Sequence, residues 1–132
     1  LRFGIHGHVD YPTAIAASLG ALRAGAGDGR ILALIEPRSN TMRAGAHRGA
    51  LLDAVSAADC TFWYQPPGLD WSLQALVEAS ERPARVLEDL DALATEVAIE
   101  ARAGDRVVIM SNGSFGGVHR LVLAALDRRS QH

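Results

Sequence analysis

Residues Asp105–Leu126 read DRVVIMSNGSFGGVHRLVLAAL and combine an apolar run, a glycine-rich turn and an amphipathic segment. Val107–Met110 is short, wholly apolar and rich in β-branched side chains, which is typical of a strand buried on both faces. Beyond the turn Ser111–Gly117, apolar residues recur at helical spacing, at Val118, Leu121, Val122, Ala125 and Leu126. The stretch therefore predicts a strand, a turn and the start of a helix.

Two interpretations of the turn stay open from these residues alone. A strand-to-helix junction exposes free backbone N–H groups at the positive end of the helix dipole, where an anion or a carboxylate can bind. A plain turn would instead use Gly113 for a positive φ and the pair Gly116–Gly117 for close packing of the helix. The glycine spacing does not match the dinucleotide motif G-x-G-x-x-G, and the turn lacks the lysine of a Walker A loop.

Composition limits what the chain can do. Its 132 residues are 48% hydrophobic, enough for one good core, so we expect a single domain over residues 1–132. All thirteen basic residues are arginines, which excludes Schiff-base chemistry and a phosphate-binding lysine within this chain. The net charge of −2, with arginines scattered over every segment, argues against nucleic acid as a partner.

The expected compartment follows from cysteine usage and hydropathy. Cys60 is the single cysteine and lies in an apolar run, so we expect no disulfide and a reducing compartment. No apolar span reaches about 18 residues and no signal-peptide pattern opens the chain, which predicts a soluble cytoplasmic protein without a membrane partner. The chain opens on Leu1 in place of an initiator methionine, and we expect it to be part of a longer protein.

Strands and helices alternate along the rest of the chain. Apolar or β-branched content predicts further strands at residues 1–5, 31–35, 60–64 and 86–87. Helices are predicted from Pro12, over the stripe Leu51, Leu52 and Val55, over Trp71–Ala79, and after the capping residue Asp89, with a stripe at Leu90, Leu93, Ala94, Val97 and Ala101. This order predicts an α/β fold: a doubly wound, mostly parallel sheet of about five or six strands with helices on both faces.

The loops that leave the strands are long and polar, whereas those that enter strands are short. They read HGHVDYP (6–12), EPRSNTM (36–42), QPPGLDW (65–71) and SNGSFGG (111–117). In an open parallel sheet these loops all emerge at the carboxyl edge, where such folds bind their ligands. Four unusual loops at one edge predict a binding site there.

The loop after the second strand carries a dense cluster of hydrogen-bond donors. The guanidinium of Arg38, next to Ser39, Asn40 and Thr41, suits a carboxylate or a phosphate. The same residues could equally be a surface arginine followed by a helix cap. His119, in the first turn of the last helix, fits a ligand contact and a solvated histidine equally well.

Other polar and aromatic side chains favour ordinary structural roles. His6, His8 and Asp10 lack the second half of any zinc pattern, so a polar loop is the preferred interpretation and no metal site is predicted. Trp63 is expected in the core and Trp71 in loop packing. No Ser/His/Asp or Cys/His set stands at a recognisable spacing, so no catalytic residue is predicted within this chain alone.

Two segments carry a family resemblance. Ile31–Met42 (ILALIEPRSNTM) with the spaced Gly45 and His47, and Val108–His119 (VIMSNGSFGGVH), closely resemble the carboxy-terminal domain of the murein peptide ligases, a branch of the Mur ligase family. The match runs in order from about Pro12 to about Leu126 and includes the QPPGLDW loop. The resemblance implies a Rossmann-like last domain of a three-domain, ATP-dependent, amide-forming ligase of peptidoglycan recycling, which joins a murein tripeptide to UDP-N-acetylmuramate.

In that family ATP and Mg²⁺ are bound mainly by the other two domains. The resemblance implies that this domain contacts the central and N-terminal domains, closes over the nucleotide, presents the peptide, and is inactive when isolated. Together with the loops, it places the peptide against Arg38, Ser39, Asn40, Thr41, Ser111, Asn112, Gly113, Phe115, Gly116, Gly117 and His119.

The loop after the first strand departs from the family pattern. Ahead of Pro12 the family has Asp-Asp, an aromatic, a small residue and His-His, where this chain has HGHVDY. Because this loop helps to hold ATP in the family, we expect His8, Asp10 and Tyr11 near the nucleotide. The alternative from another class is a stand-alone Rossmann-like module that binds a small anion or nucleotide without catalysis.

Overall fold

The structure, a computed structural model, describes residues 2–6, 12–26, 29–36, 48–65, 73–102, 104–111 and 117–130. Strands and helices alternate along them. The strands are β1 (Arg2–His6), β2 (Ile31–Glu36), β3 (Cys60–Tyr64), β4 (Ala84–Leu87) and β5 (Arg106–Ser111). The helices are α1 (Pro12–Ala26), α2 (Arg48–Ala54), α3 (Gln74–Ala79), α4 (Leu90–Glu100) and α5 (Val118–Ser130).

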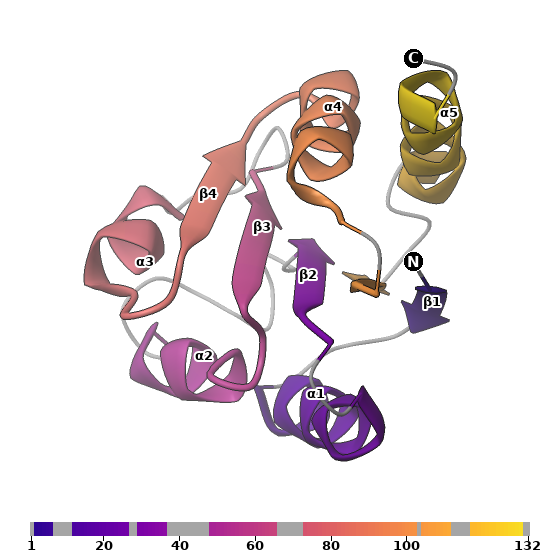
Figure 1. The fold of residues 1–132 in the computed structure, drawn as a ribbon. Helices are drawn as coiled ribbons and strands as arrows, with labels where there is room; N and C mark the ends of the chain where they lie inside the picture. The colour runs from indigo at the N-terminus through magenta and orange to yellow at the C-terminus, as the bar shows by residue number, and fades with distance from the viewer. Residues whose placement is uncertain are drawn as a thin grey trace.

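The strands form one five-stranded sheet in the order β1-β5-β2-β3-β4, and every neighbouring pair is parallel. The connections that contain α1, α2 and α3 all run in one direction across the sheet, and these helices cover one face (Figure 1). The connection through α4 runs back across the sheet from β4 to β5, which lies between β1 and β2. Helix α4 covers the opposite face together with α5. The predicted doubly wound parallel sheet is therefore confirmed.

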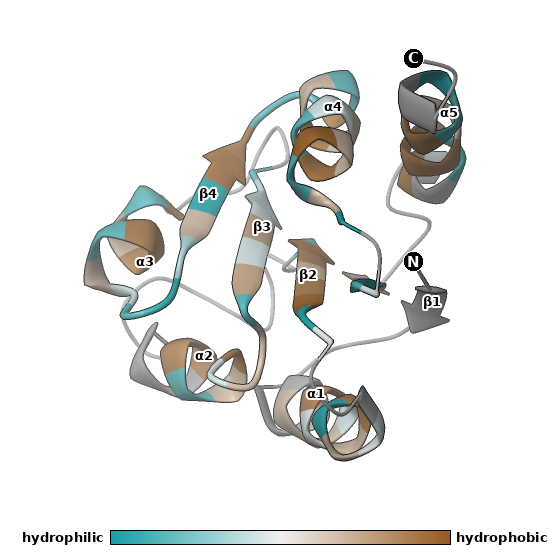
Figure 2. Ribbon diagram, in the orientation of Figure 1, coloured by the Kyte–Doolittle hydropathy of each residue, from teal (hydrophilic) through white to brown (hydrophobic). Residues whose placement is uncertain are grey.

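The central strand β2 is buried on both faces. Ile31, Ala33 and Ile35 pack under α1, α2 and α3, whereas Leu32 and Leu34 pack under α4 and α5. All five side chains are at most 1% exposed, and Figure 2 shows the apolar colour of β2 between the helical layers. The strand is apolar throughout because each face of a doubly wound sheet needs its own core.

The predicted helix stripes are also observed. In α5, Val118, Val122 and Ala125 are buried, and Leu121 and Leu126 pack against the same core.

In α4, the carboxylate of Asp89 accepts a hydrogen bond from the Ala92 N–H at 3.1 Å, which confirms the predicted cap. Trp63 lies in the core, as predicted, with 1% of its surface exposed.

Several predicted boundaries were wrong by one to three residues. His6, Glu36 and Ser111 were assigned to loops, but each is the last residue of its strand, because β5 continues to pair with both neighbours there. Strand β4 begins at Ala84 instead of Val86, since Thr61 of β3 extends the pairing backwards.

The helix predictions also needed corrections. Helix α3 begins at Gln74, later than the predicted Trp71. Val55 and Ala101 belong to the buried stripes but lie just past the ends of α2 and α4. Trp71 itself lies outside the described residues.

Salt bridges hold the amino edge of the sheet. Arg30, directly before β2, donates to both carboxylate oxygens of Asp105, directly before β5, at 3.1 and 2.7 Å. It also donates to the side chain and backbone carbonyl of Glu100 at the end of α4. Asp105 is 3% exposed and accepts a third hydrogen bond from the Arg102 N–H. A buried carboxylate needs such partners, so the pair fixes where β5 enters the sheet.

A second cluster at this edge joins α1 to β2 and β3. Asp59, just before β3, accepts hydrogen bonds from the Ile31 N–H at 2.7 Å and from Arg23 of α1. Arg23 also donates to the backbone carbonyls of Ala57 and Gly29. Burial alone would raise the pKa of Asp59, but the Ile31 N–H and the Arg23 guanidinium outweigh it and lower that pKa.

Asp59→Asn should lower the free energy of unfolding at pH 7 by about 1–3 kcal/mol, because the Ile31 N–H and Arg23 lose a charged acceptor. The folded-state pKa of Asp59 is lowered, so its contribution is present above the ordinary carboxyl pKa of about 3.9 and is lost as the pH falls through the folded-state value. Urea unfolding at a series of pH values checks this.

The difference between wild type and Asp59→Asn should shrink as the pH falls below the ordinary carboxyl pKa of about 3.9 and be lost below the lowered pKa of folded Asp59. Asp53→Asn, at an exposed carboxylate of α2, is the matched control and should leave stability nearly unchanged. A stability difference that is independent of pH would show that the charge of Asp59 is not what stabilises this edge.

Candidate functional site

At the carboxyl edge of the sheet, the connection that follows β5 leads to one face, whereas those that follow its neighbours β1 and β2 lead to the other. β5 lies between β1 and β2, with His6 opposite Met110 and Glu36 opposite Ser111. The helix that follows β5 covers one face, whereas the helices that follow β1 and β2 cover the other. Such a divergence is a topological switch point, and open parallel sheets bind ligands in the crevice outside it. Three of the four unusual loops begin at these strand ends, so this edge is the candidate site.

The structure describes only part of the predicted site. Ser111 is the last residue of β5, Gly117 directly precedes α5, and His119 lies in the first turn of that helix. The structure therefore brings these three positions to one corner of the carboxyl edge. The other predicted positions lie outside the described residues: Arg38, Ser39, Asn40, Thr41, Asn112, Gly113, Phe115, Gly116, His8, Asp10 and Tyr11.

Gly117 has the conformation that the turn requires. Its φ is +72°, in the left-handed region that costs other residues free energy. A Cβ built on Gly117 would meet no described heavy atom within 4 Å. Gly116, the other member of the pair, lies outside the described residues, so close helix packing by the pair stays a prediction. The predicted positive φ was placed at Gly113, which lies outside the described residues. Gly117 is thus the described residue at which the chain reverses into α5.

Sequence analysis gave no individual role to the polar residues at the ends of β2 and β3. Tyr64 ends the strand, and burial raises the pKa of its phenol, with further contributions from the carboxylates of Glu36 and Asp89. Its hydroxyl is therefore protonated at neutral pH and can donate a hydrogen bond. The available signal was position: Tyr64, Gln65 and Glu36 stand where strands end at the edge already singled out.

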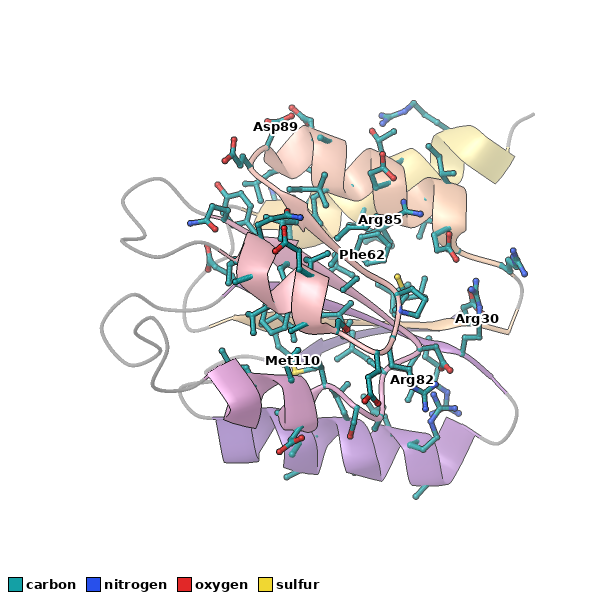
Figure 3. All side chains as sticks on the ribbon, turned by 90° about the vertical axis from the view of Figure 1, so that its left-hand side faces the viewer. Arg30, Phe62, Arg82, Arg85, Asp89 and Met110 are labelled. Atoms are coloured by element: carbon teal, nitrogen blue, oxygen red, sulfur yellow. The ribbon has the colours of Figure 1, made fainter. Side chains whose placement is uncertain are left out.

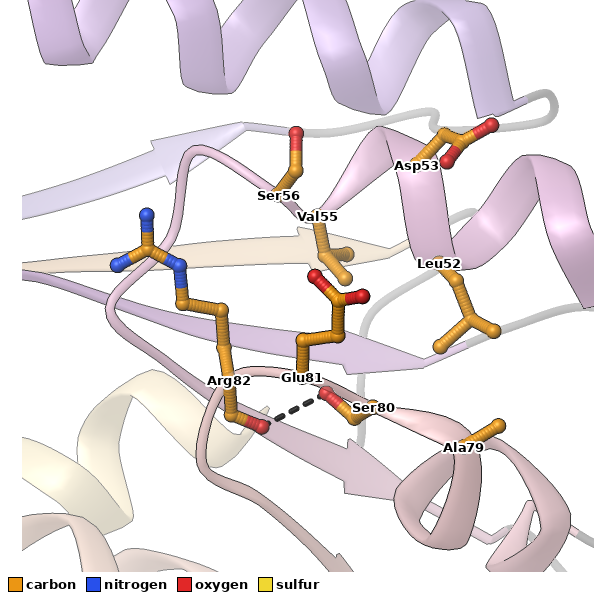
Figure 4. A pocket seen from close by; sticks show the side chains of 8 residues that line it. All are labelled: Leu52, Asp53, Val55, Ser56, Ala79, Ser80, Glu81 and Arg82. Atoms are coloured by element: carbon orange, nitrogen blue, oxygen red, sulfur yellow. Dashed lines mark hydrogen bonds between the residues drawn. The ribbon is translucent and has the colours of Figure 1, made fainter.

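A described cavity lies elsewhere. It has a volume of about 410 Å³ and lies between the ends of α2 and α3, where these helices lead into β3 and β4 (Figure 4). Its lining includes the apolar Leu52 and Val55 and the charged Asp53, Glu81 and Arg82. Because β3 and β4 begin there, this cavity is at the amino edge and is separate from the switch point. Figure 3 shows the two edges, with Asp89 towards one and Arg30 at the other.

The described residues offer neither a metal centre nor a reactive thiol. Among them, no three histidine, cysteine or acidic side chains gather closely enough to hold a metal ion. Cys60 is buried and forms no disulfide, and burial raises the pKa of its thiol to about 11. A protonated, buried thiol is a poor nucleophile. Ligand binding is the chemistry that this part of the chain supports.

Parallel strands in this order, with a switch point at β5, define a Rossmann-like domain. Mur ligases share this fold: MurF ligase from Thermotoga maritima, solved in complex with ADP, superposes with a TM-score of 0.70 at 16% identity, over 98% of this chain and 30% of that one. No protein-family model matches the chain. Among the described residues, no helix has the length and apolar character needed to span a membrane.

More similar proteins define the family. The UDP-N-acetylmuramate–L-alanyl-γ-D-glutamyl-meso-2,6-diaminoheptandioate ligase of Escherichia coli K12 is 41% identical over 122 residues, covering 92% of this chain and 27% of the ligase. A crystallised domain from a ligase of this kind in Haemophilus ducreyi is 35% identical, with a TM-score of 0.78 and coverage of 95% of this chain and 92% of that domain.

A murein peptide ligase from Psychrobacter arcticus is 37% identical, with a TM-score of 0.79, over 92% of this chain and 27% of the ligase. The chain belongs to the murein peptide ligase family, as the resemblance predicted, and matches one domain of it. It spans about 27% of the length of the full-length ligases that it matches.

Gly117→Ala should lower the free energy of unfolding by roughly 1–2 kcal/mol, because alanine must then adopt a φ of +72°. Gly20→Ala is the matched control: Gly20 lies inside α1, and a Cβ there meets nothing within 4 Å. It should raise stability by about 0.5–1 kcal/mol, because alanine favours a helix interior. Denaturant unfolding measures both. Equal effects of the two substitutions would contradict the conformational role of Gly117.

Proposed function

We propose that this chain is the carboxy-terminal, peptide-presenting domain of a three-domain, ATP-dependent ligase that joins a murein tripeptide to UDP-N-acetylmuramate. The observation that carries the proposal is the match over nearly the whole chain to a domain of such a ligase. The switch point at β5 gives this domain a binding edge of the expected kind. A nucleotide-linked sugar and ATP as substrates place the ligase in the bacterial cytoplasm, in peptidoglycan recycling.

The chemistry of the edge suits the peptide named in its relatives. A peptide of alanyl, γ-glutamyl and diaminoheptandioate residues carries several carboxylates. An arginine such as Arg38 can hold a carboxylate through two parallel hydrogen bonds, and free N–H groups at the start of α5 favour negative charge. We assign peptide contacts to Arg38, Ser39, Asn40 and Thr41, to Ser111, Asn112, Gly113, Phe115, Gly116 and Gly117, and to His119. Each of these positions ends or follows a strand at the switch point.

The fit of ATP and Mg²⁺ to this domain is partial. The described residues hold no metal-ligand cluster, and the chain has no lysine to hold nucleotide phosphates. We therefore assign the main contacts with ATP and Mg²⁺ to the central and N-terminal domains, and only proximity to the nucleotide to His8, Asp10 and Tyr11. Bound ATP supplies the activation of the carboxylate. This domain orients the peptide and, on closure, excludes water.

The isolated chain should neither hydrolyse ATP nor form an amide, because it lacks a phosphate-binding lysine and any complete catalytic set. The full-length ligase that contains it should ligate the tripeptide to UDP-N-acetylmuramate when ATP and Mg²⁺ are present. Product formation followed by mass spectrometry tests both proteins. Ligation by neither protein, together with anion binding by the isolated chain, would favour a stand-alone binding module.

Arg38→Ala in the full-length ligase should reduce kcat/KM for the peptide by an amount equivalent to about 1.5–3 kcal/mol, the range for hydrogen bonds to charged groups. The KM for UDP-N-acetylmuramate should stay the same. Arg120→Ala, at an exposed arginine of α5, is the control and should keep normal peptide kinetics. Unchanged kinetics in Arg38→Ala together with a lower melting temperature would assign Arg38 to a structural role, as a surface arginine that packs beside a helix cap.

A further inference from the structure

Gln65 joins three elements at the carboxyl edge. Its side-chain Oε1 accepts a hydrogen bond from the Leu73 N–H at 2.9 Å, directly before α3. Its backbone N–H donates to the carbonyl of Leu87, the last residue of β4, at 2.9 Å. Gln65 itself follows Tyr64, the last residue of β3. One residue therefore links the ends of two strands to the start of a helix.

The bond to Leu73 replaces a missing helix cap. Leu73 occupies the N-cap position of α3 but has no side chain that can accept a hydrogen bond from the helix. Its own carbonyl accepts from the N–H groups of Leu76 and Val77, and its side chain is fully buried under the sheet. The Gln65 oxygen supplies an acceptor for this otherwise uncapped start, across eight residues of sequence.

Gln65 also lies beside the strand that leads to Arg38. β2 and β3 are direct neighbours in the sheet, and the pair of residues nearest their carboxyl ends is Ile35 with Trp63. Glu36 and Tyr64 each follow by one residue, so Gln65 stands one position beyond the end of β3, at the same edge. A displacement of Gln65 and the end of β3 would therefore also displace Glu36 at the end of β2.

We propose that Gln65 is a positioning residue for the peptide substrate. By tying the end of β3 to the start of α3 and the end of β4, it holds this corner of the carboxyl edge in the shape that peptide binding requires. The inference rests on the proposed ligase function, and it adds a residue whose side chain acts through its hydrogen bond with the Leu73 N–H. Small displacements of a binding surface cost affinity because binding depends on preformed geometry.

Two substitutions in the full-length ligase test this role. Gln65→Met keeps the approximate size of the side chain but removes the acceptor for the Leu73 N–H. It should raise the KM for the tripeptide on the order of tenfold, the upper effect of one neutral hydrogen bond. The KM values for ATP and UDP-N-acetylmuramate should be unchanged. Gln65→Glu keeps an Oε acceptor in place and should restore most of the peptide affinity.

Asp89→Ala is the matched control for stability. The carboxylate of Asp89 also accepts a hydrogen bond from an N–H group at a helix start, that of Ala92 in α4. However, it follows the outermost strand β4, two strands away from β2. Both Gln65→Met and Asp89→Ala should lower the melting temperature, because each removes one such bond. Only Gln65→Met should raise the KM for the peptide.

The outcomes separate this inference from the proposed function. If the wild-type enzyme ligates the tripeptide and Gln65→Met loses stability without a change in the KM for the peptide, Gln65 is purely structural and the inference is overturned. The same holds if Asp89→Ala raises that KM equally. If the wild-type enzyme does not ligate the tripeptide, it is the proposed function that fails. A selective rise in the peptide KM, restored by Gln65→Glu, supports the inference.

Discussion

The salt bridge between Arg30 and Asp105 determines how β5 enters the sheet. Asp105 is buried directly before β5, and Arg30 directly precedes β2, so their pairing sets the start of both strands. The backbone adds to this: the Arg106 N–H donates to the Arg30 carbonyl at 2.8 Å. In a parallel sheet a shift of one residue would turn every side chain of β5 to the wrong core. The two cores on either side of β5 therefore depend on this entry point.

The position of β5 in turn creates the candidate binding edge. Its insertion between β1 and β2 places three strands side by side whose following helices cover opposite faces. Open parallel sheets bind ligands outside the carboxyl ends of strands in such an order. The amino edge, by contrast, carries ion pairs around Asp59 and Asp105 that tie its strands together. Stabilising interactions and candidate binding positions thus occupy opposite ends of the same strands.

Much of this arrangement was predictable from the sequence, because apolar runs and helix stripes are local patterns. Asp89 as a cap, Trp63 in the core and the stripe of α5 were all predicted correctly. The order of the strands, including the position of β5 between β1 and β2, could not be predicted in this way. It depends on contacts between residues far apart in sequence. The last residues of β1, β2 and β5 were missed for the same reason, since pairing with β5 extends β1 and β2.

Gln65 illustrates why part of the site could not be predicted. In the sequence it is a polar residue before two prolines, which indicates only that a strand has ended. Its importance arises from a hydrogen bond to Leu73, which no spacing rule anticipates, and from a backbone bond to Leu87 that requires β4 as a neighbour. A residue that shapes a binding edge through other residues has no chemical signature of its own. It is found only when the hydrogen bonds of each strand end are followed to their partners.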